Sequence, residues 1–195
     1  MSFQALYEEV QLTSGKISTN WIEERAVALS RITKITEMWS DVIDPHALRG
    51  FYIEGPLGPP IELGENESLI GLSRRMCKGA EGKYYRRYVK TKEIMHVFDT
   101  DQELTNTAEK FDKLVERFAD PAAAVPPQYY AESKAIWRAL AVLCREEQRI
   151  YYKEQIAQNA MSVEVVSTAL QIPTLMVRQL MRDNFLDYLA IILND

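Results

Sequence analysis

The sequence has few cysteines, which limits how the fold can be held together. Among 195 residues there are two, Cys77 and Cys144, and their separation does not match the C-x-x-C spacing of thiolate metal sites. Neither a disulfide framework nor a cysteine zinc cluster is therefore expected. We expect both thiols to be reduced and partly buried.

Long hydrophobic runs are also missing. The most apolar segment, Phe185 to Leu193, is interrupted by Asp187 and has about half the length that a membrane-spanning helix needs. The first residues are acidic and lack the basic stretch followed by an apolar stretch that marks a secretory signal. We therefore expect a cytoplasmic protein without a membrane partner.

The composition that is present suits one folded domain. Hydrophobic residues make up 47% of the chain and aromatic residues 10%, enough for a core at this length. The formal net charge of −5 repels nucleic acid on average, although a local basic patch can still attract it. We predict a single domain over residues 1–195, with a core at 20–157 and a C-terminal helical extension at 158–195.

Hydrophobic periodicity predicts mainly helices. We expect a loose arm over residues 1–17, a helix over 21–42 that begins after Asn20, and a small β-hairpin formed by residues 49–54 and 61–64. Further helices are expected at 83–98, 106–118, 130–157 (one long helix or two abutting ones), 162–170 and 173–182. The pattern predicts an α+β fold that is mostly helical.

One short motif points to chemistry. The segment Lys92-Glu93-Ile94-Met95-His96 has the spacing of the zinc-protease signature H-E-x-x-H, with lysine in place of the first histidine. Residues i and i+4 share a helix face, so two histidines there can bind one zinc ion while the adjacent glutamate activates a water molecule. By itself K-E-x-x-H is common in ordinary helices and carries little weight.

The flanking residues strengthen the motif, because they resemble the ImmA/IrrE metallopeptidase family. Arg86 to Thr91 and Val97 to Asp99 are similar to its R-R-F-x-x-A-H-E-L-G-H-L-L-H context, and residues 132–145 are similar in register to its E-x-x-A-N-x-F-A-A-x-L-L-M-P. Ala135, Ala139 and Leu143 match the second pattern, whereas Ile136, Arg138 and Arg145 depart from it. The resemblance implies a zincin-like helical domain with a small hairpin or short sheet and a C-terminal helical pair.

The resemblance also assigns roles to individual residues. Glu93 takes the place of the general base, and His96 and Glu132 take the places of two zinc ligands, but Lys92 replaces the remaining ligand. A lysine ammonium has no lone pair to donate near neutral pH, and its charge repels a dication. We therefore expect a vestigial site without a cofactor, with zinc only if the site works in an altered form. Lys92 either pairs with Glu132 between two helices or extends its ammonium into solvent.

A basic stretch lies just before this motif. Between Gly71 and Lys92 the basic residues outnumber the single acid Glu81, and tyrosines are interleaved with them. This stretch either contacts phosphates or is a solvated face that balances the acidic remainder of the chain. The candidate residues for a nucleic-acid or anion patch are Arg74, Arg75, Lys83, Arg86, Arg87 and Lys90.

Three functions stay open at this point. The first is a degenerate metallopeptidase-like domain that regulates through a protein partner, for which the resemblance implies a helix-turn-helix transcriptional repressor. The second is an active metallo-endopeptidase with an altered metal site. The third is a DNA- or RNA-binding regulator that uses the basic stretch. The apolar C-terminal segment also permits a homo-oligomer.

Overall fold

The computed structural model describes residues 2–46, 48–77, 79–105, 107–120, 122 and 124–194. The strands are β1 (Lys34–Ser40), β2 (Gly50–Glu54) and β3 (Glu67–Ser73), and two 3₁₀ turns are η1 (Arg74–Cys77) and η2 (Met95–Phe98). The helices are α1 (Phe3–Leu12), α2 (Thr19–Ala28), α3 (Gly79–Ile94), α4 (Ala108–Ala119), α5 (Pro127–Leu143), α6 (Glu146–Ala157), α7 (Val163–Leu170), α8 (Thr174–Leu180) and α9 (Phe185–Leu193). The predicted class, α+β and mostly helical, is confirmed.

The three strands form one mixed sheet in the order β1-β3-β2. β3 is the central strand, parallel to β1 and antiparallel to β2, and all but its first residue are buried. The predicted hairpin is right for β2 but wrong for its partner, because β2 pairs with β3 and residues 61–64 contribute only one bridge, between Leu57 and Leu63. A strand buried on both faces is nearly all apolar, and the run Leu69-Ile70-Gly71-Leu72 meets that demand.

The helix predicted over residues 21–42 is wrong in its second half. α2 ends at Ala28, and the chain becomes strand β1 at Lys34. Ile35, Met38 and Trp39 have helical spacing, but the β-branched residues Ile35 and Thr36 favour a strand once β3 offers a partner. The helix also starts earlier than predicted, because the Ser18 side chain rather than Asn20 accepts the capping hydrogen bond, from the Trp21 amide at 3.1 Å.

The N-terminal residues do not form a loose arm. They form α1, which buries Phe3, Leu6 and Val10 at helical spacing. The Phe3 ring meets the Phe98 ring edge-on at 5.9 Å between centroids. The first helix is therefore part of the core.

The helices predicted between residues 83 and 182 lie close to their positions in the structure, whereas α9 falls in the predicted helical extension 158–195 without having been predicted as a separate helix. α3 begins before residue 83, and its last predicted turn is the 3₁₀ turn η2. The segment 130–157 is two abutting helices, α5 and α6, which separate at Cys144. α4 agrees with the helix predicted from Asn106, although Asn106 itself lies outside the described residues.

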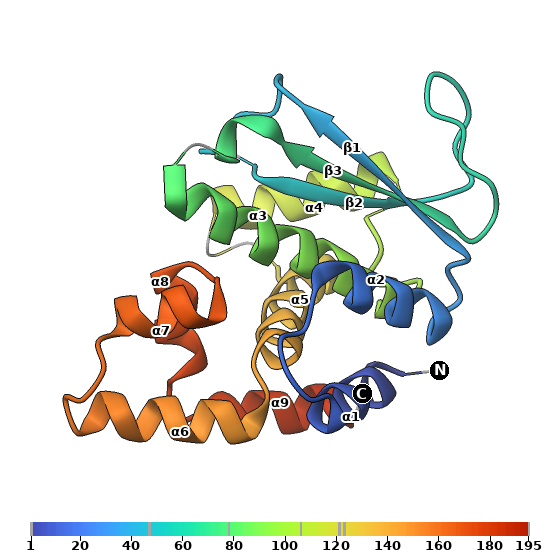
Figure 1. Cartoon of the computed structure of the whole chain (residues 1–195). Helices are drawn as coiled ribbons and strands as arrows, with labels where there is room; N and C mark the ends of the chain where they lie inside the picture. Colours follow the sequence, from blue (N-terminus) through green and yellow to red (C-terminus); the bar gives the residue numbers. More distant parts are fainter. Residues whose placement is uncertain are drawn as a thin grey trace.

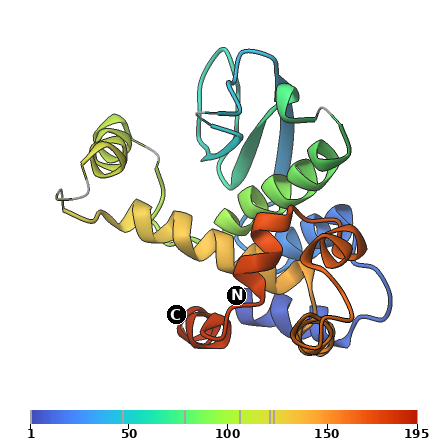
Figure 2. The same cartoon turned by 90° about the vertical axis from the view of Figure 1, so that its left-hand side faces the viewer.

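Figure 1 shows the sheet lying over one side of α3, with α5 at the centre and α1, α6 and α9 on the opposite side of the molecule. Figure 2 shows α4 projecting at the end of α5, away from the C-terminal helices α7 to α9. One continuous hydrophobic cluster includes residues from α1, α2, the sheet, α3, α5 and α7 to α9. Among the described residues, no helix combines the length and apolar character needed to cross a membrane.

Candidate functional site

The residues of the K-E-x-x-H motif lie where α3 passes into η2. Lys92 and Glu93 are in the last turn of α3, and His96 is in η2. β2 passes very close to them, since a Cβ added to Gly50 would lie 2.8 Å from a methyl carbon of Val89 and 3.2 Å from Cγ of Glu93. Glycine at this position allows the sheet to cover the motif.

The four residues named from the sequence come together. The Lys92 ammonium lies 3.3 and 3.4 Å from the two carboxylate oxygens of Glu93, and it donates a short hydrogen bond to Oε2 of Glu132 on α5. His96 Nε2 lies 3.8 Å from Glu93 Oε2 and 3.6 Å from Glu132 Oε1. We call Lys92, Glu93, His96 and Glu132 the charge cluster.

Of the two orientations considered for Lys92, the structure has the ion pair between helices. The Lys92 side chain is 13% exposed and Glu93 is 3% exposed, whereas Glu132, at 35%, lies at the rim. The ammonium therefore joins α3 to α5 from the inside and does not extend into solvent.

A second pair of residues fixes the orientation of the His96 ring. His96 Nδ1 lies 2.6 Å from Oδ2 of Asp99, and the Arg138 guanidinium on α5 donates to Oδ1 of the same carboxylate at 2.7 Å. The ring of Tyr52 on β2 stacks on the imidazole at 5.8 Å between centroids. These contacts direct Nε2 toward the two glutamates of the charge cluster.

The site includes three residues that the sequence did not assign to it: Asp99, Arg138 and Tyr52. The signal for Asp99 was its position three residues after His96, within reach of the same turn. Arg138 stood out only as a charged residue where the family pattern has an apolar one.

Burial and charge together set the protonation states of the cluster. Burial alone would lower the pKa of Lys92, but Glu93 and Glu132 raise it above its ordinary value. Burial raises the pKa of Glu93, against the opposing effect of Lys92 and His96. Burial would lower the pKa of His96, but the Asp99 carboxylate raises it overall. The cluster therefore already holds the Lys92 cation against its carboxylates.

These residues fit only part of what a zinc site requires. His96 Nε2 is buried and has no hydrogen-bond partner among the described residues, and its other nitrogen faces a carboxylate, as in many zinc-binding histidines. However, the charged Lys92 ammonium contacts both glutamates and has no lone pair to offer. Over the described part of the chain, no group of three His, Cys, Asp or Glu residues is arranged to hold a metal ion. The donor set does not fit zinc.

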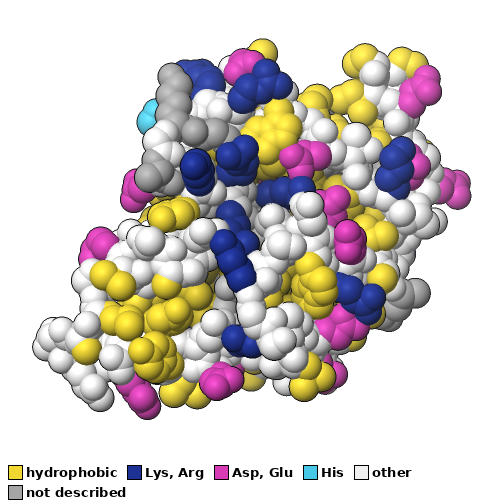
Figure 3. Space-filling view, viewed as in Figure 1, with side chains coloured by type: hydrophobic (Ala, Val, Ile, Leu, Met, Phe, Trp, Pro, Cys, Tyr) yellow, Lys and Arg dark blue, Asp and Glu magenta, His cyan; other side chains and the backbone are white. Residues whose placement is uncertain are grey.

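The six residues of the predicted basic patch fall into two groups. Arg74 lies on η1 and pairs with Asp41 at 3.0 Å, and Arg75 is exposed on the same turn. The other four lie on α3 and line one hollow: Lys83, Arg86, Arg87 and Lys90. Thr19, Glu37 and Trp39 complete its lining. Figure 3 shows Lys and Arg side chains gathered on this face between the sheet and the helices below it.

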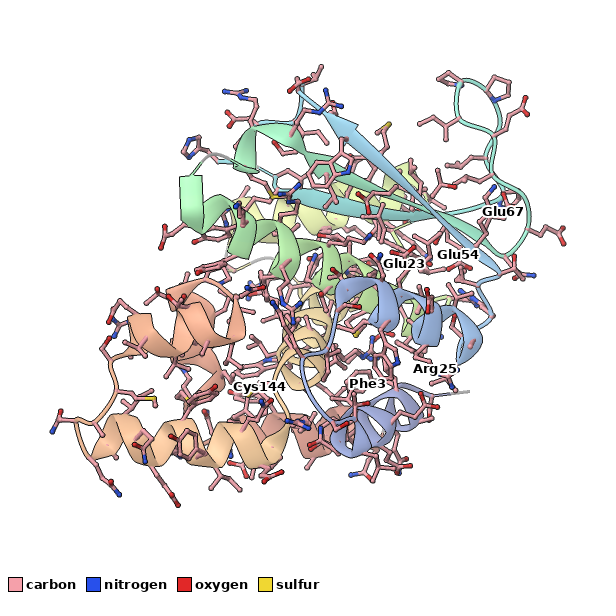
Figure 4. All side chains as sticks on the ribbon, viewed as in Figure 1. Phe3, Glu23, Arg25, Glu54, Glu67 and Cys144 are labelled. Carbon is pink, nitrogen blue, oxygen red and sulfur yellow. The ribbon has the colours of Figure 1, made fainter. Side chains whose placement is uncertain are left out.

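Cys144 does not supply a nucleophile. Figure 4 shows it in the interior, where α5 meets the C-terminal helices, and it is a free thiol with 3% of its surface exposed. Burial raises the pKa of this thiol to about 12, so the thiolate is scarce near neutral pH. The side chain of Cys77 lies outside the described part of the structure.

No protein family, curated protein or solved structure matches the chain. The charge cluster and the hollow lined by the four basic residues of α3, here called the basic hollow, are the two features that bear on function.

Proposed function

We propose that the protein is a pseudo-enzyme, a metallopeptidase-like domain that has lost catalysis and acts by binding a protein partner. The Lys92 ammonium is the observation that carries this proposal. It contacts the carboxylates of Glu93 and Glu132, the two acids that the family resemblance assigns to the reaction and to the metal.

The ammonium can take over the structural part of a metal ion. A zinc ion in a metallopeptidase would connect the motif helix to the helix that supplies the later ligand, and Lys92 makes the same connection between α3 and α5. A single positive charge beside two carboxylates needs no fixed coordination geometry. The helices stay joined without a bound metal.

The same contacts argue against peptide hydrolysis. A general base needs a free carboxylate within hydrogen-bond reach of the attacking water. Glu93 is instead in contact with an ammonium, and its carboxylate is almost fully buried. The Lys92 ammonium therefore competes with a water molecule for the carboxylate of Glu93, which opposes its use as a general base.

Two observations support a protein partner: the family resemblance and the exposed apolar side chains of the C-terminal helices. The family resemblance implies a helix-turn-helix repressor as the partner, and the C-terminal helices expose large apolar side chains that suit a protein contact. Val165 is 52% exposed, Leu175 54% and Ile191 68%. We place the partner surface on α7, α8 and α9.

The substitution Lys92→His tests this proposal. It restores the complete H-E-x-x-H motif beside Glu132, with Asp99 already orienting His96, so the variant should retain about one zinc per chain after zinc addition and dialysis. Metal content is measured by inductively coupled plasma mass spectrometry. The double variant Lys92→His/His96→Ala serves as the control and should retain none.

The opposite result is equally clear. If Lys92→His folds, as judged by circular dichroism, and still retains no zinc, the cluster is not a metallopeptidase-like site and the proposal fails. Zinc retained equally by the control would show adventitious binding elsewhere on the chain, and the proposal would fail in the same way.

A further inference from the structure

The basic hollow is a separate feature from the charge cluster. Lys83, Arg86, Arg87 and Lys90 follow one another at steps of three, one and three residues, which places them on one face of α3. Lys92 lies about half a helical turn away from this face. The hollow has a volume of about 280 Å³.

Positive charge in the hollow is only partly neutralised. Lys90 pairs with Glu23 on α2 at 2.9 Å and with Glu37 on β1 at 2.5 Å, and Figure 4 shows Glu23 on the side of α2 that faces the sheet. Within the described ranges, no carboxylate lies within ion-pair distance of Lys83, Arg86 or Arg87. Like charges at these helical spacings also repel one another, which adds to the preference of the hollow for an anion.

Arg87 carries the clearest sign of a missing partner. Its side chain is half-buried, and burial lowers its pKa from the ordinary value. One guanidinium nitrogen donates to the Ile17 carbonyl at 2.7 Å, while Nε is buried and has no partner among the described residues. A guanidinium taken out of water is normally paired with a carboxylate or a phosphate.

The walls of the hollow add to its preference for an anion. Thr19, the first residue of α2, lines the hollow, so the end of that helix that carries a partial positive charge lies beside it. The Arg86 guanidinium lies 5.7 Å from the centre of the Trp39 ring, which holds it at the wall. The Trp39 indole N–H is already used, because it donates to Glu37.

We propose that this hollow binds the phosphate group of a small molecule, with Arg87 and Arg86 as guanidinium donors and Lys83 as a third positive charge. A phosphate offers three acceptor oxygens and a charge near −2, which matches these donors. The volume suits a phosphate or diphosphate with a small substituent and not a polymer. Arg74 and Arg75 lie outside the hollow, and the chain as a whole is acidic, so the positive charge forms a pocket and not a track for nucleic acid.

The test uses the full chain and inorganic pyrophosphate as the probe, in isothermal titration calorimetry. Wild type should bind about one pyrophosphate per chain in a saturable manner. Arg87→Met should weaken binding about tenfold or more, because a charge-assisted donor is lost. Arg74→Met removes the same charge from a nearby position outside the hollow and should change the affinity by less than about twofold.

Three results would overturn the proposal. The first is no saturable binding at up to ~10 mM pyrophosphate. The second is equal weakening in Arg87→Met and Arg74→Met, which would indicate a diffuse field. The third is tighter binding of a single-stranded oligonucleotide, measured by fluorescence anisotropy, than of pyrophosphate. This result would indicate a nucleic-acid surface. If Arg87→Met does not fold, the exposed pair Lys83→Met/Arg86→Met takes its place with the same expected loss.

Discussion

Replacing Lys92 with methionine should destabilise the protein strongly, although the substitution hardly changes the volume of the side chain. The methionine fills most of the space of the lysine stem, so no cavity term is expected. What is lost is the positive charge that faces Glu93 and Glu132. Both carboxylates then face each other and His96 without the ammonium.

The magnitude follows from the burial of the three side chains. Removing one partner of a fully buried ion pair costs about 3–5 kcal/mol, because a charge stays behind without compensation. Glu93 is almost completely buried, but Glu132 is 35% exposed and water screens part of its charge. We therefore expect the free energy of unfolding to fall by about 2–3 kcal/mol.

Urea unfolding near neutral pH measures this loss, and a double-mutant cycle assigns it to the pair. Lys92→Met and Glu132→Gln together should cost less than the sum of the two single changes, with a coupling of about 1–2 kcal/mol. Lys83→Met, which removes an exposed lysine from the same helix, should change the stability by less than about 0.5 kcal/mol. If Lys92→Met costs no more than this control and shows no coupling to Glu132, the ammonium does not hold α3 to α5.

Two further predictions concern buried titratable groups. Burial alone would raise the pKa of Asp99, but its imidazole and guanidinium partners lower it below the usual value. The stability that Asp99 contributes is therefore present above about pH 4 and is lost as the pH falls through its lowered pKa. In urea unfolding measured from neutral to acid pH, Asp99→Asn should therefore lose less stability on acidification than wild type does. If Asp99→Asn loses as much stability on acidification as wild type, the pKa of Asp99 is not lowered in the folded protein. Cys144, whose pKa is raised to about 12, should resist iodoacetamide at mildly alkaline pH until the chain unfolds in urea, as followed by peptide mass spectrometry; rapid labelling of the native protein would place the thiol at the surface.

Local sequence signals predicted the helices between residues 83 and 182 well and the sheet poorly. The bounds of α7 and α8 agree with the prediction to within two residues, because Ser162 and Pro173 mark their starts. The division into α5 and α6 was one of two alternatives that the sequence left open. β1 was mistaken for helix because its pairing depends on β3, whose residues begin 33 positions later, at Glu67 against Lys34. α1 was missed although Phe3, Leu6 and Val10 have helical spacing.

In the candidate site too, some contacts could be predicted from the sequence and others could not. The Lys92–Glu132 pair could be anticipated, since the family resemblance places these two residues beside one metal ion. The Asp99–Arg138 pair could not, because it joins residues 39 positions apart that share no motif. The basic hollow was visible only as a charged stretch, and the pairing of Lys90 with Glu23 and Glu37 required the packing of α2 and β1 on α3.

The most direct test of the central claim, that the Lys92 ammonium stands in place of a metal ion, is the metal content of the purified, untagged wild-type protein. Mass spectrometry is applied before and after zinc addition and dialysis, with His96→Ala as the control. Because the charge cluster is complete without a metal, we expect folded wild-type protein without stoichiometric zinc both before and after zinc addition. About one zinc per chain, lost in His96→Ala, would contradict the claim and would make Glu93 a working general base.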